Sequence, residues 1–319
     1  MKTGFDEQRL LVKIARMYYE QDMTQARIAQ VLDLSRQKVQ RLLSQARDEG
    51  VVHILVRPVA GTYAELERAL ESRYGLREAV VVETTDYENL ATIARELGAA
   101  GAKYLTRAIR LGDRVVMGWG STLLETVNAC FHNPRPTVKD VLIIQSMGGL
   151  GDANYDAHIT VLTRRLADYL RGQGMILPAP GLAGTRKAQK AFVADPHISN
   201  VLEKARAANL ALTGIGAPGK DSTVVKEGQF VSWPQLAQLA QMGAVGDINL
   251  RYFDEEGRLV KSELDERVIG LTLEELSKID IVVAIAGGAV KFKAIQGALR
   301  GHFVNVLITD HVTAQKLLA

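Results

Sequence analysis

Four residues in the run "GDRVVMGWGSTLLETV" are of types that could bind an anion. Gly118 and Gly120 carry no side chain, and Ser121 and Thr122 offer hydroxyls where an apolar strand would pass into a helix. Unpaired N–H groups and the dipole at a helix start favour a phosphate there. The run lacks the GK[ST] of a Walker loop and the GxGxxG fingerprint. A tight strand-to-helix turn also needs glycines in any case, so the loop alone is a weak signal.

Four other polar side chains follow strands or glycine pairs. Lys291 and Lys293 come after two glycines in "IAGGAVKFKAIQGAL", where a helix would start and where a cation opposes the dipole unless an anion is near. A solvated lysine pair is the alternative. Asp247, in "QMGAVGDINLRYFDEEG", could accept hydrogen bonds from a polyol, and a turn-capping carboxylate is its alternative. Gln145 ends "VLIIQ" and could bind substrate hydroxyls. A loop in "GIGAPGKDST" could close the same pocket.

The composition excludes several other kinds of chemistry. Cys130 is the single cysteine, which excludes an internal disulfide and fits a reducing cytoplasm. The six histidines show no metal-ligand spacing, so we expect no metal site. We also expect no catalytic residue and no cofactor. No apolar run approaches the ~20 residues that span a bilayer, and the polar N-terminus is no signal peptide. We therefore expect a cytoplasmic protein without membrane contact.

The elements that must position these residues are strands alternating with helices from about residue 76 onward. The candidate strands are "EAVVV", "RVVMGWG", "VLIIQS", "MILPA", "LALTGIG", "INLRYF", "IVVAIAGG" and "VNVLITD". Such alternation predicts a mostly parallel sheet covered by helices on both faces, an α/β Rossmann-like domain. Ligands bind such sheets at the carboxyl ends of the strands, where glycine-rich loops lead into helices.

The first fifth of the chain differs in charge. Residues 1–57 hold 10 Lys and Arg against 7 Asp and Glu, whereas residues 58–319 hold 29 of each kind. The whole net charge of +3 therefore lies in the N-terminal part. An excess of this kind fits a module that binds a polyanion.

This N-terminal part predicts three helices. The first is amphipathic, in "DEQRLLVKIARMYYEQ". Thr24 is a good N-cap for the second, and Ser35 for the third, which Gly50 ends. A short turn joins the last two, and small Ala29 lies where their axes cross. This pattern is a helix-turn-helix.

The outward residues of the third helix suit a DNA major groove, since Arg and Lys donate to guanine and Gln can bridge adenine. A solvated helical bundle is the alternative. The residues that we expect to contact bases are Arg36, Gln37, Lys38, Gln40 and Arg41, and those expected to fix register on phosphates are Tyr18, Tyr19, Thr24 and Gln25. We also expect Ser35 at the DNA interface.

Two segments follow this module. "VVHILVRPV" alternates like a β-strand and predicts a wing or the start of a connector. "TYAELERALESRYG", within residues 58–75, predicts a helix that serves as a linker or dimerisation element. An ordinary packing helix is the alternative.

Over its whole length the chain resembles the SorC/DeoR-type family of bacterial sugar-responsive transcriptional regulators. The resemblance is carried by "MTQARIAQVLDLSRQKVQRLLSQARDEGVV", "GWGSTL", "AVGDINLRYFD" and "VVAIAGGAVKFKAIQGALRGHFVNVLITDHVTAQKLL". It implies a winged helix-turn-helix in residues 1–57 and, in residues 58–319, an effector and oligomerisation domain. That domain is similar to phosphosugar isomerases of the ribose-5-phosphate isomerase and glucosamine-6-phosphate deaminase type.

The resemblance also implies roles for individual residues. Gly118, Gly120, Ser121 and Thr122 look like the phosphate loop, completed by Lys291, and Asp247 and Gln145 look like hydroxyl-binding residues. Trp119 would narrow the pocket, and Lys293 has no family role. Tyr18, Tyr19, Gln25, Arg36, Gln37 and Arg41 fall where the family contacts DNA.

The expected function is regulation of a carbohydrate or polyol operon. The partners would be a double-stranded DNA operator and a sugar or sugar-phosphate effector, and the assembly a homodimer or homotetramer. A sugar-phosphate isomerase with an appended DNA-binding head is the alternative, although isomerisation needs a placed general base and supporting acids. The "DGADE"-type segment of ribose-5-phosphate isomerases is absent from this chain. A helix-turn-helix that only mediates protein contacts is the third possibility.

Overall fold

The structure, a computed structural model, describes residues 2–53, 62–149, 158–220, 222–226 and 231–319. The chain divides into two compact units, Met1–Val59 and Ala60–Ala319. The boundary expected after residue 57 falls in residues 54–61 and so lies outside the described residues, as does most of the expected wing strand. Residues 51–53, which are described, form no strand.

The N-terminal unit contains helices α1 (Lys2–Tyr19), α2 (Gln25–Leu32) and α3 (Arg36–Asp48). The hydroxyl of Thr24 accepts the Arg27 N–H at 3.3 Å, and that of Ser35 accepts the Lys38 N–H at 3.2 Å, so both expected N-caps are confirmed. The apolar sides of the helices meet in one core that includes Ile14, Ile28, Val39 and Leu42. These residues form the helix-turn-helix that the sequence predicts.

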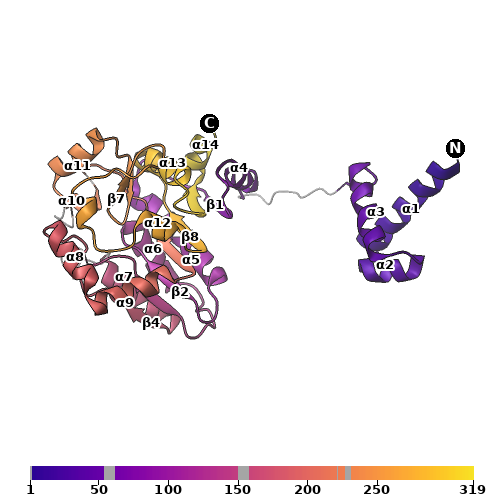
Figure 1. Cartoon of the computed structure of the whole chain (residues 1–319). Coiled ribbons are helices and arrows are strands. Elements are labelled where there is room, and N and C mark those ends of the chain that lie inside the picture. The colour runs from indigo at the N-terminus through magenta and orange to yellow at the C-terminus, as the bar shows by residue number, and fades with distance from the viewer. Residues whose placement is uncertain (1, 54–61, 150–157, 221, 227–230) are drawn as a thin grey trace. The chain divides into compact units, whose positions relative to one another are not determined.

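The second unit is built on a parallel sheet. Among the described residues it has seven strands in the order β1-β9-β8-β5-β2-β3-β4. The strands are β1 (Glu78–Val82), β2 (Arg114–Met117), β3 (Leu142–Gln145), β4 (Gln173–Met175), β5 (Leu210–Thr213), β8 (Ile281–Ile285) and β9 (Val306–Asp310). All pairs in this sheet are parallel, which confirms the predicted fold class (Figure 1).

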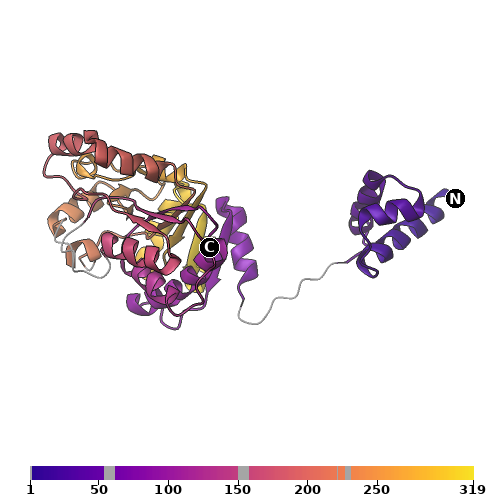
Figure 2. The same cartoon turned by 90° about the horizontal axis from the view of Figure 1, so that it is seen from below.

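Helices cover both faces of the sheet (Figure 2). Those on one face are α5 (Leu90–Ala108), α6 (Ser121–Cys130) and α7 (Ile159–Leu170). Those on the other are α8 (Arg186–Ala194), α9 (Pro196–Arg206), α12 (Leu273–Ser277), α13 (Phe292–Arg300) and α14 (His311–Leu318). Successive strand side chains alternate between the two cores: Val115 and Met117 face α6, and Val116 faces α9.

Helix α4 (Ala64–Tyr74) covers the edge of the sheet at β1. The Glu71 carboxylate accepts the Ala79 N–H, and the Glu67 carboxylate accepts the Val81 N–H, each at 2.9 Å. These two side chains satisfy outward N–H groups that an edge strand otherwise presents to solvent or to another chain. The segment considered as a linker therefore packs on the second unit.

A smaller layer of the second unit is not part of the seven-stranded sheet. It contains α10 (Thr223–Lys226), α11 (Trp233–Gln241) and the antiparallel strands β6 (Gly246–Ile248) and β7 (Arg251–Phe253). The prediction of a single strand over "INLRYF" is wrong. Asn249 and Leu250 have φ of 55° and 61°, and they turn the chain into a hairpin. The Asp247 carboxylate holds this turn by accepting the Leu250 N–H at 3.0 Å.

None of the helices in the described ranges is both long and apolar enough to span a membrane.

Candidate functional site

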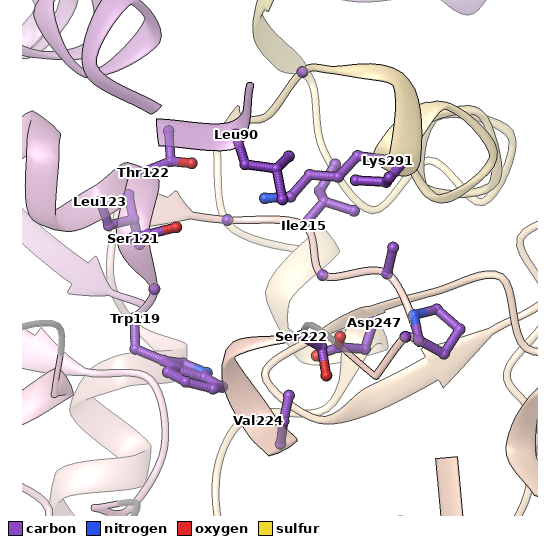
Figure 3. Close-up of a pocket in the computed structure, with 18 of the residues that line it drawn as sticks. Leu90, Trp119, Ser121, Thr122, Leu123, Ile215, Ser222, Val224, Asp247 and Lys291 are labelled. Atoms are coloured by element: carbon purple, nitrogen blue, oxygen red, sulfur yellow. The ribbon is translucent and has the colours of Figure 1, made fainter. Parts of the chain in front are cut away.

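A cavity of about 360 Å³ lies at the carboxyl ends of β2, β5 and β8 (Figure 3). The chain leaves β2 toward β3 on one side and β5 toward β8 on the other, so the strand order reverses between β2 and β5. Loops diverge at such a reversal and leave a crevice. The walls come from the loops after these three strands, from the β6–β7 hairpin and from the start of α5. The volume is in the range of small-molecule sites.

The loop after β2 presents a helix start to this cavity. The first N–H groups of a helix have no intrahelical partner. Gly120, with φ of 119°, is the N-cap of α6 and supplies no side-chain cap for them. Trp119, Gly120, Ser121 and Thr122 all line the cavity, and the Ser121 hydroxyl points into it (Figure 3). The geometry therefore suits an anion.

Gly118 lies at the end of β2 beside β5, unlike the loop residues that follow it. Its N–H donates to the Leu212 carbonyl at 2.8 Å, and a Cβ there would lie 3.0 Å from that oxygen. It allows β2 and β5 to meet closely, and it is not among the described residues that line the cavity.

Lys291 lies across the cavity from the loop. It ends the short 3₁₀ helix η2 (Ala289–Lys291) directly before α13, and it is half-buried. Its side chain extends toward Ser121 and Thr122 (Figure 3). Burial removes water from the ammonium and lowers its pKa, and the charge of Asp247 acts in the opposite direction. Lys293, by contrast, is exposed and lies 3.7 Å from Glu255.

Asp247 forms the wall opposite Ser121 and Thr122 and is 5% exposed. Its backbone exchanges two hydrogen bonds with Gly216, at 2.9 and 3.1 Å, where a side chain would collide with the carboxylate. Burial raises the pKa of Asp247 to about 6, although the Leu250 N–H and the Lys291 charge favour the ionised form. The carboxylate can therefore accept hydrogen bonds from a bound hydroxyl near neutral pH.

The structure does not bring Gln145 to the cavity wall. Its side chain is fully buried; the amide N–H donates to the Thr160 hydroxyl, and the amide oxygen accepts the Leu177 N–H, both at 2.7 Å. Gln145 thus joins β3 to α7 and to the segment after β4. The position of Gln145 at a strand end suggested a ligand-binding role. The two residues that occupy its amide are distant in sequence, so the sequence alone did not reveal them.

Several lining residues were not identified from the sequence. Asn249 joins Asp247 on the polar wall, and Leu90 and Ile93 of α5 form an apolar one. Ser222, which belongs to the predicted loop "GIGAPGKDST", also lies on the polar wall. The Ser222 hydroxyl is buried and has no hydrogen-bond partner among the described residues. Residues 214–220 of "GIGAPGKDST" also line the cavity, as the sequence predicts. Asn249 carried no signal because it lies inside an apolar run.

The residues expected to bind DNA lie on the surface of the N-terminal unit. Arg36, Gln37, Lys38, Gln40 and Arg41 are all exposed on α3. The hydroxyls of Thr24 and Ser35 serve as caps, and Gln25 begins α2. The Tyr18 and Tyr19 rings meet edge to face at 4.9 Å.

A helix-turn-helix unit joined to an α/β unit with an anion-compatible cavity is the architecture of a transcriptional regulator. Comparison with known proteins gives the family. The model described as "Putative sugar-binding domain" matches residues 60–319, and that of Sigma-70, region 4, matches residues 12–49. The chain belongs to the SorC/DeoR-type family of transcriptional regulators with this sugar-binding domain.

Individual relatives match over nearly the whole chain. The deoxyribonucleoside regulator of Bacillus subtilis (strain 168) is 33% identical over 316 residues, and the sorbitol operon regulator of Klebsiella pneumoniae is 30% identical over 321, each with 98% of both chains covered. The crystal structure of the full-length sorbitol operon regulator SorC from Klebsiella pneumoniae has a TM-score of 0.71 at 29% identity, covering 98% of both chains. The family resemblance of the sequence is confirmed.

Proposed function

We propose that this regulator controls a carbohydrate or polyol catabolic operon and that a phosphorylated sugar in the cavity sets its affinity for operator DNA. One observation carries the proposal: an uncapped helix start, a half-buried lysine and a buried carboxylate line one cavity at the strand-order reversal. A phosphate would bind the N–H groups of the α6 start, the hydroxyls of Ser121 and Thr122, and Lys291. The sugar hydroxyls would then reach Asp247.

We propose binding rather than catalysis in this cavity. With a pKa of about 6, Asp247 could act as a base. Aldose–ketose isomerisation also needs groups that move protons between neighbouring oxygens. Asp247 is the one acidic side chain among the described residues that line the cavity. The named relatives are regulators, which supports the same choice.

DNA binding would use paired copies of α3. A homodimer or homotetramer would place two such helices in successive major grooves, about one helical turn apart. The exposed Arg and Gln side chains near the start of α3 have the chemistry for base edges. Salt should weaken this binding steeply, because phosphate contacts release counterions.

The effector site is tested by a thermal-shift screen of the full chain. The panel contains sorbitol, sorbitol 6-phosphate, ribose 5-phosphate, glucosamine 6-phosphate and inorganic phosphate. We expect a phosphorylated sugar to raise the melting temperature most, since a ligand that binds the folded state stabilises it by mass action.

Comparing the variants Lys291→Ala and Lys293→Ala then distinguishes ligand binding at this site from a general effect of positive charge. Both remove one positive charge near the start of α13, but Lys293 is exposed. We expect Lys291→Ala to weaken the phosphorylated hit at least about tenfold, because it removes a charge-assisted contact, and Lys293→Ala to leave it unchanged. A free polyol as the sole hit, with equal affinity in both variants, would contradict the phosphate site.

A further inference from the structure

Helix α14 joins one rim of the effector cavity to the helix that opens the second unit. Gly287 lines the cavity, and the N–H of the next residue, Gly288, donates to the Asp310 carboxylate at 2.9 Å and to the Thr313 hydroxyl at 3.1 Å. Asp310 is the N-cap of α14. The cavity rim and the start of α14 are therefore held by one cluster.

This cluster has little freedom to deform. The Asp310 carboxylate also accepts the Thr313 N–H and the Thr313 hydroxyl, each at 2.7 Å, and both side chains are fully buried. A Cβ on Gly287 would collide with the same carboxylate. If the Gly288 amide moved, Asp310 would have to follow or lose a donor, and a buried carboxylate with a missing partner is costly.

The other side of the start of α14 contacts α4. The ring of His311, which follows Asp310, stacks on the ring of Tyr63 with centroids 5.3 Å apart and planes 15° apart. The Nδ1 atom of His311 accepts the Thr84 N–H at 3.2 Å, which fixes the ring. Tyr63 is the N-cap residue of α4 and is two residues from segment 54–61, through which the chain continues to the DNA-binding unit.

The far ends of the two helices are also joined. The Tyr74 hydroxyl donates to the Leu317 carbonyl at 2.9 Å, and the Arg73 guanidinium donates to the Leu318 carbonyl at 2.5 Å. Helices α4 and α14 thus lie parallel and side by side (Figure 1). A displacement of α14 is expected to shift α4 as a unit.

We propose that α14 transmits effector occupancy from the Gly287–Lys291 rim to α4, through the Asp310–Thr313 cluster and the Tyr63–His311 stack. This rests on the proposed function, because the signal starts with an anion bound beside Lys291. Within this rim, Gly288 and Lys291 belong to one turn, since the Lys291 N–H donates to the Gly288 carbonyl at 3.1 Å. A force on Lys291 therefore reaches Gly288 directly.

The test is hydrogen–deuterium exchange on the full chain, with inorganic phosphate as the probe and potassium chloride at equal ionic strength as the control. In the wild type, phosphate should change exchange at residues 118–124 and 286–293. It should also change exchange at residues 62–72, which hold the N-cap and most of α4, by about fivefold or more. Tyr63→Phe keeps the ring and should behave like the wild type.

Tyr63→Leu and His311→Ala remove the stack without touching the cavity. In both, residues 118–124 and 286–293 should still respond to phosphate, and residues 62–72 should not. Lys316→Ala, which removes a contact of α14 with the Tyr87 ring, is the matched control and should retain all three responses. Unchanged circular dichroism and melting temperature would show that each variant is folded.

Two outcomes would overturn the relay. A response of residues 62–72 that survives in both stack variants would show that α4 is coupled by another route. A wild-type rim that responds while residues 62–72 do not would show that α4 is static. If neither the rim nor residues 118–124 responded, the phosphate site would fail first and the relay with it, which separates the two failures.

Discussion

The Asp247 carboxylate lies where burial in the folded protein disfavours its ionised form. Its side chain lies against the backbone of Gly216 and receives one hydrogen bond within the hairpin, from Leu250. Leu250 adopts a positive φ to make this possible, a conformation that costs about 1–3 kcal/mol in a non-glycine residue. Strain and a buried charge at one spot are typical of a binding site that its ligand completes.

We predict that Asp247→Asn stabilises the free protein above pH 6. The folded-state pKa of about 6 exceeds the unfolded value of 3.8, so the folded chain binds more protons between these values and loses stability as pH rises through them. Asn avoids the loss, by up to about 3 kcal/mol at pH 8, since one pKa unit corresponds to about 1.4 kcal/mol.

The check is the melting temperature of both proteins at pH 8 and pH 4. The variant should melt several degrees higher at pH 8, and the difference should shrink toward pH 4. A variant that melts lower at pH 8 would contradict the assigned cost of the carboxylate. The same variant should lose affinity for the phosphorylated sugar, because an amide cannot replace the carboxylate as a double acceptor.

Local spacing in the sequence predicted the anion-binding loop but did not reveal which polar side chains are already occupied by partners within the fold. Ser121 and Thr122 could be found because a strand, two glycines and a helix start are adjacent in sequence. Lys291 could be found because a cation at a helix start is locally unfavourable. Gln145 had a similar strand-end position, but its amide is occupied by Thr160 and Leu177, which no local pattern reveals.

At the scale of elements, α4 explains how one edge of the sheet avoids pairing with other chains. Glu67 and Glu71 lie one turn apart, so both carboxylates face β1, where they accept outward N–H groups. We predict that Glu67→Ala with Glu71→Ala lowers the free energy of unfolding by about 1–3 kcal/mol per unsatisfied N–H group.

Urea unfolding followed by tryptophan fluorescence would measure this loss. Glu65→Ala is the matched control, since Glu65 contacts only the exposed Arg68 among the described residues and should change stability little. Equal stability of the double variant and the control would mean that water replaces the two carboxylates. The sequence predicted this helix from its stripe, but its role depends on a strand edge that only the fold defines.

The β6–β7 hairpin shows the limit of periodicity for short elements. "INLRYF" is apolar enough for a continuous strand, yet Asn249 and Leu250 form a turn within it. Asn tolerates a positive φ, whereas Leu does not. The turn forms because Asp247 and the apolar contacts of Leu250 and Tyr252 hold it, and those contacts come from the tertiary structure.

The cavity and helix α3, which we propose reads DNA, belong to separate compact units. An effector can change DNA affinity only if it binds the DNA-competent and incompetent states differently, and linkage makes the effect reciprocal. Bound operator must then change sugar affinity by the same factor. The relay through α14 and α4 is a physical route for this coupling inside the second unit.

In the proposed function, one chain couples sugar binding to DNA binding. The most direct measurement starts from duplexes that the full chain selects from a random pool. Fluorescence anisotropy then gives the affinity of an enriched duplex with and without the sugar phosphate that stabilises the protein most. We predict a change of about 5–150-fold in affinity, in line with typical coupling energies.

Variants locate both ends of the coupling. Arg36→Ala with Arg41→Ala should abolish selective binding, whereas Arg47→Ala, at the exposed far end of α3, should keep it. Lys291→Ala should keep DNA binding and lose the response to the sugar phosphate. An enriched duplex that binds with the same affinity at saturating concentrations of every sugar tested, or a pool that shows no enrichment, would contradict the account.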